Sequence, residues 1–198
     1  MTQQSATRSS AREKRTDQRS LRRVGAASLI GTTIAMILFA RKNGIPVWSM
    51  FDVVAAVAPI GLLFGRIANF INGELWGRIA DGPWAVVFPT GGPFARHPSQ
   101  LYEAGLEGVL LGALLLWLAL ARGWLKTPGR IAAMFFAGYG AARFFVEFFR
   151  QPDEQFVSPG NPLGLAWHVG GWGLTMGQLL SLPMIVVGLW LVLRKRPA

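Results

Sequence analysis

Hydrophobic residues are concentrated in five blocks, which are separated by polar or glycine- and proline-rich segments. The blocks cover about residues 24–40, 50–71, 101–121, 131–149 and 176–193. Each block is close to the length of about 20 residues that a helix needs to cross the hydrocarbon core of a bilayer. The pattern therefore predicts an all-α membrane protein with about five transmembrane helices and two long interfacial loops. These loops are residues 72–100 and 150–174, whose tryptophans suit a membrane interface.

The segment before the first block, residues 1–23, is polar and basic and shows no apolar periodicity. We expect it to be a disordered tail, followed by one membrane-embedded domain over residues 24–198. A secretory signal fits poorly, because no cleavage site with small residues follows the first apolar block.

Lysine and arginine are unevenly distributed among the connections, and this asymmetry predicts the orientation. The short connections and the C-terminus carry Arg41, Lys42, Arg122, Lys126, Arg130, Arg194, Lys195 and Arg196, whereas the two long loops carry Arg78, Arg96 and Arg150. The C-terminus is therefore expected to be cytoplasmic. Five crossings would place the basic N-terminal tail outside, so either the first block does not cross or the tail does not belong to the original topology.

The composition excludes several kinds of chemistry. The 198 residues contain no cysteine, which excludes a disulfide scaffold, a zinc–thiolate site, an iron–sulfur cluster and a thiol nucleophile of this chain. P-loop, HExxH and GxSxG motifs are absent, and two histidines in different loops make a poor metal site. The net charge of +10 is carried largely by the tail and by residues that flank apolar blocks. We therefore expect no cofactor, no metal and no nucleic-acid partner.

Ionisable side chains lie within the apolar blocks, toward the ends that face the long loops. Such groups are costly in a bilayer unless they face the bundle interior and find a partner. Arg66 and Asn69 share one helix face, and Glu103 and Glu107 share another. Each glutamate is expected to pair with an arginine from a neighbouring helix.

The fourth block carries Tyr139, Arg143 and Glu147 as a stripe with a spacing of four residues. An ion pair between Arg143 and Glu147 within the helix would account for two of them. Alternatively, Arg143 faces a cavity that it shares with Arg66. Two guanidinium groups at similar depth repel each other unless carboxylates or a bound phosphate lie between them.

The segment His97-Pro98-Ser99-Gln100 precedes the third block. Either His97 or Ser99 is expected to cap the helix that begins there.

Four segments together resemble the prolipoprotein diacylglyceryl transferase family, from about Leu29 to Leu193. They are GRIANFINGELWGR (65–78), HPSQLYEA (97–104), YGAARFFVEFFRQPDEQ (139–155) and LTMGQLLSLPM (174–184). The resemblance implies a multi-pass protein of the bacterial inner membrane that acts toward the outer leaflet. It implies transfer of diacylglyceryl from phosphatidylglycerol to the lipobox cysteine thiol of a prolipoprotein, with formation of a thioether. The implied partners are phosphatidylglycerol, the prolipoprotein signal peptide with its lipobox, and membrane lipids.

The resemblance also implies roles for individual residues. Arg66, Arg143 and Tyr139 are expected to be catalytic, the two arginines by holding the phosphate and stabilising charge on the leaving group. The residues expected to bind or position the substrate are Arg66, Asn69, Asn72, Gly77, Glu74, Glu147, Glu103 and His97.

The sequence departs from the family pattern near its start. Members usually have seven spans and a His-Gly-Gly segment, whereas the equivalent stretch here reads Ala26-Ala27-Ser28-Leu29-Ile30-Gly31. The alternative hypothesis is therefore an N-terminally truncated, non-catalytic membrane protein that binds phospholipid. A small transporter or channel, with the buried charges lining a pathway, is a third hypothesis.

Overall fold

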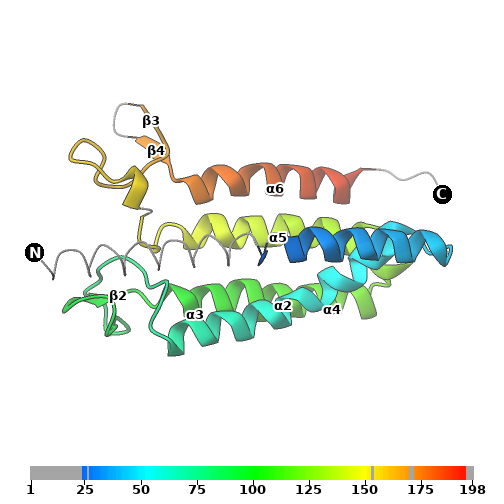
Figure 1. Ribbon diagram of the computed structural model, residues 1–198, viewed down its shortest axis with the longest axis horizontal. Helices are drawn as coiled ribbons and strands as arrows, with labels where there is room; N and C mark the ends of the chain where they lie inside the picture. Colours follow the sequence, from blue (N-terminus) through cyan, green and yellow to red (C-terminus); the bar gives the residue numbers. More distant parts are fainter. Residues whose placement is uncertain (1–23, 26, 153, 170–171, 195–198) are drawn as a thin grey trace, which may run out of the picture. The chain divides into compact units, whose positions relative to one another are not determined.

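The computed structural model describes residues 24–25, 27–152, 154–169 and 172–194 (Figure 1). The chain divides into two compact units, Met1–Met50 and Phe51–Ala198. In the first unit, residues 27–42 form a helix. At its C-terminal end, a backbone carbonyl group accepts hydrogen bonds from the residue that follows the helix. The backbone N–H and the side-chain amide of Asn43 both donate to the Phe39 carbonyl, and Gly44 follows with a φ of +67°.

Helices make up most of the described residues. The helical elements are α2 (Val47–Ile71), α3 (Ser99–Glu103), η1 (Ala104–Leu110), α4 (Leu111–Leu120), η2 (Trp124–Lys126), α5 (Arg130–Val146), η3 (Glu154–Phe156) and α6 (Met176–Leu193). Four short strands form two antiparallel pairs: β1 (Val86–Val87) with β2 (Ala95–Arg96), and β3 (Trp167–Val169) with β4 (Trp172–Leu174). The long loops therefore contain small sheets that the hydrophobic pattern did not predict.

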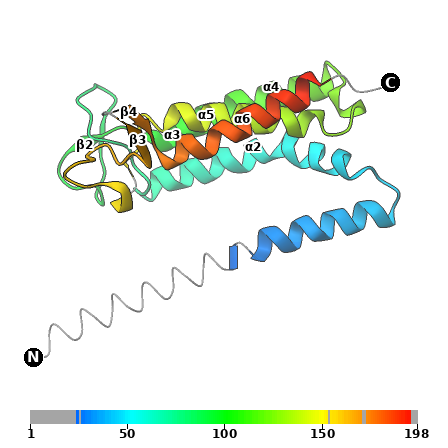
Figure 2. The ribbon, with the colours of Figure 1, turned by 90° about the horizontal axis from the view of Figure 1, so that it is seen from above.

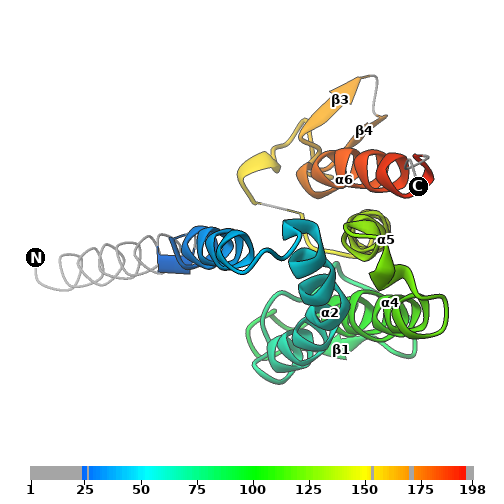
Figure 3. The ribbon, with the colours of Figure 1, turned by 90° about the vertical axis from the view of Figure 1, so that its right-hand side faces the viewer.

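Three helices within the described residues are long and apolar enough to cross a membrane, and the chain is an α-helical membrane protein. They are α2, the continuous stretch Ser99–Leu120 and α6. The helix α5 has 17 residues and the helix over residues 27–42 is shorter, so crossings by these two remain predictions. In the second unit α5 lies between α4 and α6, and the three helices run along a common direction (Figures 1, 2 and 3).

The continuous stretch Ser99–Leu120 changes its pitch in the middle, where η1 is a π-helix. Buried positions recur about every four residues along it, at Gln100, Ala104, Gly108 and Gly112. A four-residue repeat drifts around an α-helix of 3.6 residues per turn. The π-helix has more residues per turn and takes up this drift, so the same face stays buried at both ends.

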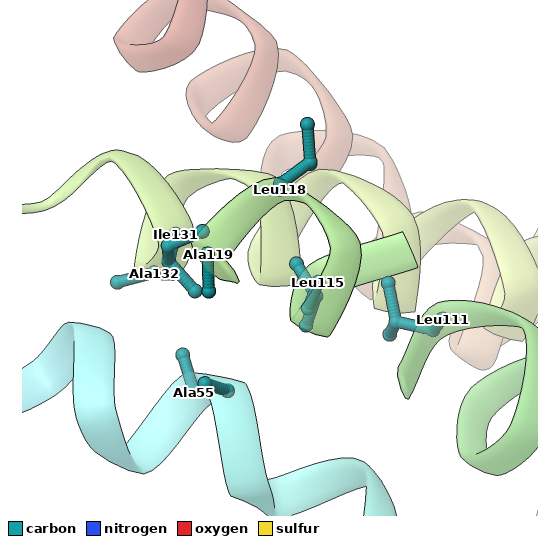
Figure 4. Packing of buried hydrophobic residues seen from close by; sticks show 8 residues of the cluster. Ala55, Leu111, Leu115, Leu118, Ala119, Ile131 and Ala132 are labelled. Atoms are coloured by element: carbon teal, nitrogen blue, oxygen red, sulfur yellow. The ribbon is translucent and has the colours of Figure 1, made fainter. Parts of the chain in front are cut away.

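The apolar core of the second unit joins α2, α4 and α5. Its members are Ala55, Ala56, Leu111, Leu115, Leu118, Ala119, Ile131 and Ala132. Figure 4 shows Ala55 of α2 facing Ala119 of α4 and Ala132 of α5. Close by, the buried Asp52 of α2 accepts hydrogen bonds from the backbone N–H groups of Gly129 and Ala132 and so caps α5 from a neighbouring helix.

The expected cap on the third block is wrong. The residue before α3 is Pro98, and no side chain caps this helix. The Ser99 hydroxyl instead donates to the Leu75 carbonyl at 3.2 Å, because the loop after α2 folds back onto the start of α3. The Nε2 of Gln100 likewise donates to the Glu74 carbonyl. Both side chains therefore fasten the loop to α3.

Candidate functional site

Glu103, at the end of α3, lies at the centre of a cluster of charged side chains. Its Oε2 is 3.0 Å from Nη1 of Arg66 on α2, and its Oε1 accepts a hydrogen bond from Nη1 of Arg143 on α5 at 3.1 Å. The two arginines therefore contact opposite oxygens of the same carboxylate. The expectation that carboxylates lie between two guanidinium groups from different helices is confirmed.

Two further glutamates complete the acidic side of this cluster. Glu107 on η1 accepts a hydrogen bond from Nη2 of Arg66 at 3.4 Å. Glu147, directly after α5, lies 2.9 Å from Nη2 of Arg143. Arg143 thus pairs with Glu147 of its own segment and also contacts Glu103 on a neighbouring helix, whereas a cavity shared with Arg66 stays a prediction.

Arg150 is a third arginine in the cluster. Its Nη1 donates to Glu103 Oε1 at 2.9 Å, and its Nε lies 3.8 Å from Glu147. Arg150 is predicted from the sequence to lie in a long loop and is not among the predicted site residues. Its spacing of seven residues from Arg143 would have been a signal, because residues seven apart lie on one face of a helix.

Burial separates the acids from the bases in this cluster. The side chains of Glu103 and Glu107 are 0% exposed and that of Glu147 is 8% exposed, whereas Arg66, Arg143 and Arg150 are 17–21% exposed. The three carboxylates balance the three guanidinium groups in formal charge, but the arginine side chains are more exposed than the glutamate side chains. The accessible face of the cluster is therefore cationic and carries N–H donors suited to phosphate.

Backbone hydrogen bonds at Gly77 connect the loop between α2 and α3 to the segment directly after α5. The Gly77 N–H donates to the His97 carbonyl at 2.9 Å, and Gly77 forms an isolated bridge with Arg150. A Cβ at Gly77 would collide with the carbonyl oxygens of Phe149 and His97, so this crossing requires a glycine. The structure therefore places Gly77 at a backbone junction that positions Arg150.

Other predicted site residues lie at varying distances from the three arginines. Nδ1 of His97 is 3.1 Å from the Tyr102 hydroxyl, and the His97 ring packs edge-on against Tyr102 and Phe149. The amide of Asn72 donates to the carboxylate of Glu74 at 3.3 Å, and both side chains are exposed. The described contacts of His97, Asn72 and Glu74 are thus outside the charged cluster.

Asn69 and Tyr139 lie on α2 and α5, the helices that carry Arg66 and Arg143. Asn69 follows Arg66 by three residues on α2, and Tyr139 precedes Arg143 by four on α5, so each shares the helix face of its arginine. Tyr139 is stacked on Phe135, with ring centroids 5.7 Å apart. Its ring is therefore held next to the cluster by the core.

Two cavities adjoin the helices of the cluster. A cavity of about 300 Å³ with a mixed lining is bordered by Glu147 and the loop before α6; its lining residues are Arg78, Glu147, Phe148, Leu163, Leu165, Trp172, Gly173, Thr175 and Gln178. An apolar groove of about 550 Å³ runs between η1–α4 and α5; it is lined by Leu106, Leu110, Leu111, Leu114, Gly138, Ala141, Ala142 and Phe145. Within the described residues, no group of three His, Cys, Asp or Glu side chains could hold a metal ion.

Comparison with known proteins gives the same family as the sequence motifs. A protein-family model described as "Prolipoprotein diacylglyceryl transferase" matches residues 24–194. The chain is 68% identical over 170 residues to the phosphatidylglycerol--prolipoprotein diacylglyceryl transferase of Agrobacterium fabrum, covering 86% of this chain and 57% of that protein. It is 59% identical over 179 residues to the protein of that name from Roseobacter denitrificans (86% and 61%). It is 61% identical over 170 residues to the one from Sinorhizobium medicae (86% and 57%).

The chain thus spans about three fifths of the length of the curated relatives that it matches. The matched region contains the whole charged cluster, from Arg66 to Arg150. The chain therefore belongs to the prolipoprotein diacylglyceryl transferase family.

Proposed function

We propose that the chain transfers diacylglyceryl from phosphatidylglycerol to the lipobox cysteine thiol of a prolipoprotein. The substrates are those in the names of the relatives, and the cluster around Glu103 supplies a site with the required charge. The lipobox is the part of the prolipoprotein that must reach this site, because the chain itself contains no cysteine.

The observation that carries the proposal is the sharing of one buried carboxylate by Arg66 and Arg143. Because Glu103 contacts both guanidinium groups through one nitrogen each, it holds them close together and leaves further N–H donors of each group for an anion. A phosphodiester has one negative charge and several acceptor oxygens, so it can accept hydrogen bonds from two neighbouring guanidinium groups.

In the proposed reaction the thiol releases its proton to solvent, and its sulfur forms a bond to the glyceryl carbon of the lipid. The bond between that carbon and the phosphate oxygen breaks, and glycerol phosphate leaves with an additional negative charge on its phosphate. Arg66 and Arg143 stabilise this developing charge, in the manner of an oxyanion hole. Asn69 and Tyr139, each on the face of one arginine, orient glycerol oxygens.

The membrane arrangement follows from the charge distribution of the connections. We place the C-terminus in the cytoplasm and the Glu103 cluster toward the outer leaflet of the bacterial inner membrane, where a lipobox would arrive. The apolar groove beside α5 would accommodate an acyl chain of the lipid, because its lining is aliphatic apart from one phenylalanine.

The test is a transfer assay with the full chain in liposomes that contain phosphatidylglycerol and a lipobox peptide. We expect thioether formation together with glycerol phosphate release, and a fall of about 10²–10³-fold in kcat for Arg143→Gln. Arg143→Lys is expected to remain strongly impaired, because it keeps the charge but loses the fork. Arg122→Gln, at the far end of the bundle, is the matched control and should retain full activity.

Two outcomes would contradict the proposal. Normal turnover of Arg143→Gln would exclude the guanidinium pair from catalysis. Binding of phosphatidylglycerol by the unaltered chain without any release of glycerol phosphate would instead favour the alternative, a phospholipid-binding protein that does not catalyse transfer.

A further inference from the structure

A cationic cavity lies between the start of α5 and the end of α6. It has a volume of about 320 Å³ and is lined by Thr127, Arg130, Val192, Leu193 and Arg194; we refer to it as the Arg130–Arg194 pocket. On α5, Arg130 and the cluster residue Arg143 are about 20 Å apart at a rise of 1.5 Å per residue. The pocket is therefore at the opposite end of the bundle from the Glu103 cluster.

Among the described residues, the lining of the Arg130–Arg194 pocket carries two guanidinium groups and one hydroxyl but no carboxylate. The sequence has no acidic residue in residues 108–146 or 176–198, which include all of α4, α5 and α6. At this end α2 contributes Asp52, which is fully buried, with both oxygens accepting hydrogen bonds from backbone N–H groups of α5. The charge of the described lining is therefore complementary to an anion.

Both arginines of the pocket lie over tryptophan rings. The guanidinium carbon of Arg130 is 3.9 Å from the ring centroid of Trp124, and that of Arg194 is 5.5 Å from the ring centroid of Trp190. At 3.9 Å the guanidinium of Arg130 is in contact with the Trp124 ring, and the longer distance of Arg194 is still within the range of a cation–π interaction. Tryptophan and arginine together are typical of the membrane–water boundary.

The packing of α5 against α6 fixes the distance between the two arginines. Gly188 of α6 lies so close to Ala133 and Ala137 that a Cβ there would fall 2.5 Å from the Ala137 nitrogen. Such close contact between backbones is characteristic of tightly associated helices in membranes. The pocket is therefore a preformed feature of a rigid helix pair.

The surface next to the pocket is apolar. On α6 the side chains of Val186, Trp190 and Leu193 are 59–77% exposed, and they lead from the pocket along the helix. A ligand that fits both surfaces has an anionic head and long apolar chains. Basic pockets between transmembrane helices are known to hold lipid head groups in this way.

We propose that the Arg130–Arg194 pocket binds the phosphodiester of an anionic phospholipid, at a site separate from the one where the transferred lipid reacts. One phosphate oxygen accepts from Arg130 and another from Arg194, and the acyl chains lie along the exposed face of α6. Phosphate is the chemistry recognised, and a membrane phospholipid is its source. The bound lipid would join the ends of α5 and α6 at the inner surface of the membrane.

The experiment measures lipid retention by the full chain after delipidation in detergent, with native mass spectrometry and dioleoyl phosphatidylglycerol as the probe. We expect the affinity of one bound lipid to fall about 30-fold in the double variant Arg130→Gln/Arg194→Gln. The matched control is Arg122→Gln, because Arg122 also lies 5.5 Å from a tryptophan ring centroid, that of Trp117, but does not line the pocket. Thermal unfolding without lipid checks that every variant is folded, and the single variant Arg194→Gln replaces the double variant if that one is unstable.

Three outcomes would overturn the proposal. They are equal retention by the double variant and Arg122→Gln, equal retention of dioleoyl phosphatidylcholine, and displacement of the lipid by millimolar inorganic phosphate. The last would indicate a site for free anions. The proposal does not depend on the transferase reaction, because Arg143→Gln should abolish transfer while leaving this bound lipid in place.

Discussion

The substitution Glu103→Gln tests whether one buried carboxylate holds the charged cluster together. It preserves the shape of the side chain, removes its negative charge and replaces one acceptor oxygen by an NH₂ donor. The two oxygens of Glu103 lie 2.9–3.1 Å from guanidinium nitrogens of Arg66, Arg143 and Arg150. The substitution therefore weakens three ion pairs at once.

The expected loss of stability follows from the burial of the Glu103 carboxylate, which is shared by three ion pairs. Exposed ion pairs contribute about 0.2–1 kcal/mol, whereas removing one partner of a buried pair costs about 3–5 kcal/mol. Glu103 is 0% exposed, so the second range applies, and the partial exposure of the arginines places the loss near its lower end, at about 3 kcal/mol. For a chain of this size, that corresponds to a fall of about 6–12 °C in the midpoint of unfolding.

Thermal unfolding of the purified protein in one detergent, followed by circular dichroism, measures this fall. The matched control is Glu74→Gln, because Glu74 is exposed and its carboxylate accepts from the Asn72 amide. We expect the control to change stability by no more than about 0.5 kcal/mol. Equal midpoints for Glu103→Gln and Glu74→Gln would refute the idea that the cluster depends on a shared carboxylate.

Three further substitutions test the supports of the site. Asp52→Asn should lower the free energy of unfolding by about 2–3 kcal/mol in a denaturant titration, because the amide can accept only one of the two backbone hydrogen bonds at the start of α5; an unchanged midpoint would contradict this cap. Gly177→Ala should reduce transfer at least about tenfold, because its Cβ would fall 2.5–2.8 Å from the carboxylate of Glu147. Gly61→Ala, whose Cβ meets nothing within 4 Å, should leave transfer unchanged, and equal activities would exclude the steric argument. Thr175→Ala removes the capping box of α6 and should cost about 1 kcal/mol in the same titration, with no loss meaning that the cap is dispensable.

The pairing of charges between helices could be predicted from the sequence. Glu103, Glu107 and Arg66 lie in apolar blocks, and the cost of burying a lone charge requires partners for each of them. The structure confirms these partners: Arg66 contacts both glutamates, and Arg143 contacts Glu103. The pairing is predictable because the free-energy cost of an unpaired charge in an apolar block does not depend on the details of the packing.

Other parts of the site depend on contacts between distant segments, which a single sequence does not encode locally. Arg150 joins the cluster because the loop after α2 forms a bridge with it through Gly77. The cap on α5 comes from Asp52, which lies in an apolar helix far away in the sequence. The expectation that His97 or Ser99 would cap α3 was wrong for the same reason, because the backbone of a distant loop competes for the Ser99 hydroxyl.

The change of pitch at Ala104–Leu110 has a consequence for how this span tolerates change in length. The π-helix joins two α-helical parts of the span. The rotation of the first part directs Glu103 toward its arginines, and that of the second part directs Leu115 and Leu118 toward the core. Deletion of a single residue within the π-helix would only remove the additional residue that it holds. Deletion of a residue between Leu110 and Leu115, where the helix is regular, would instead turn the leucines by about 100° relative to Glu103. Either the carboxylate or the leucines would then face lipid, so this span can vary in sequence far more easily than in length.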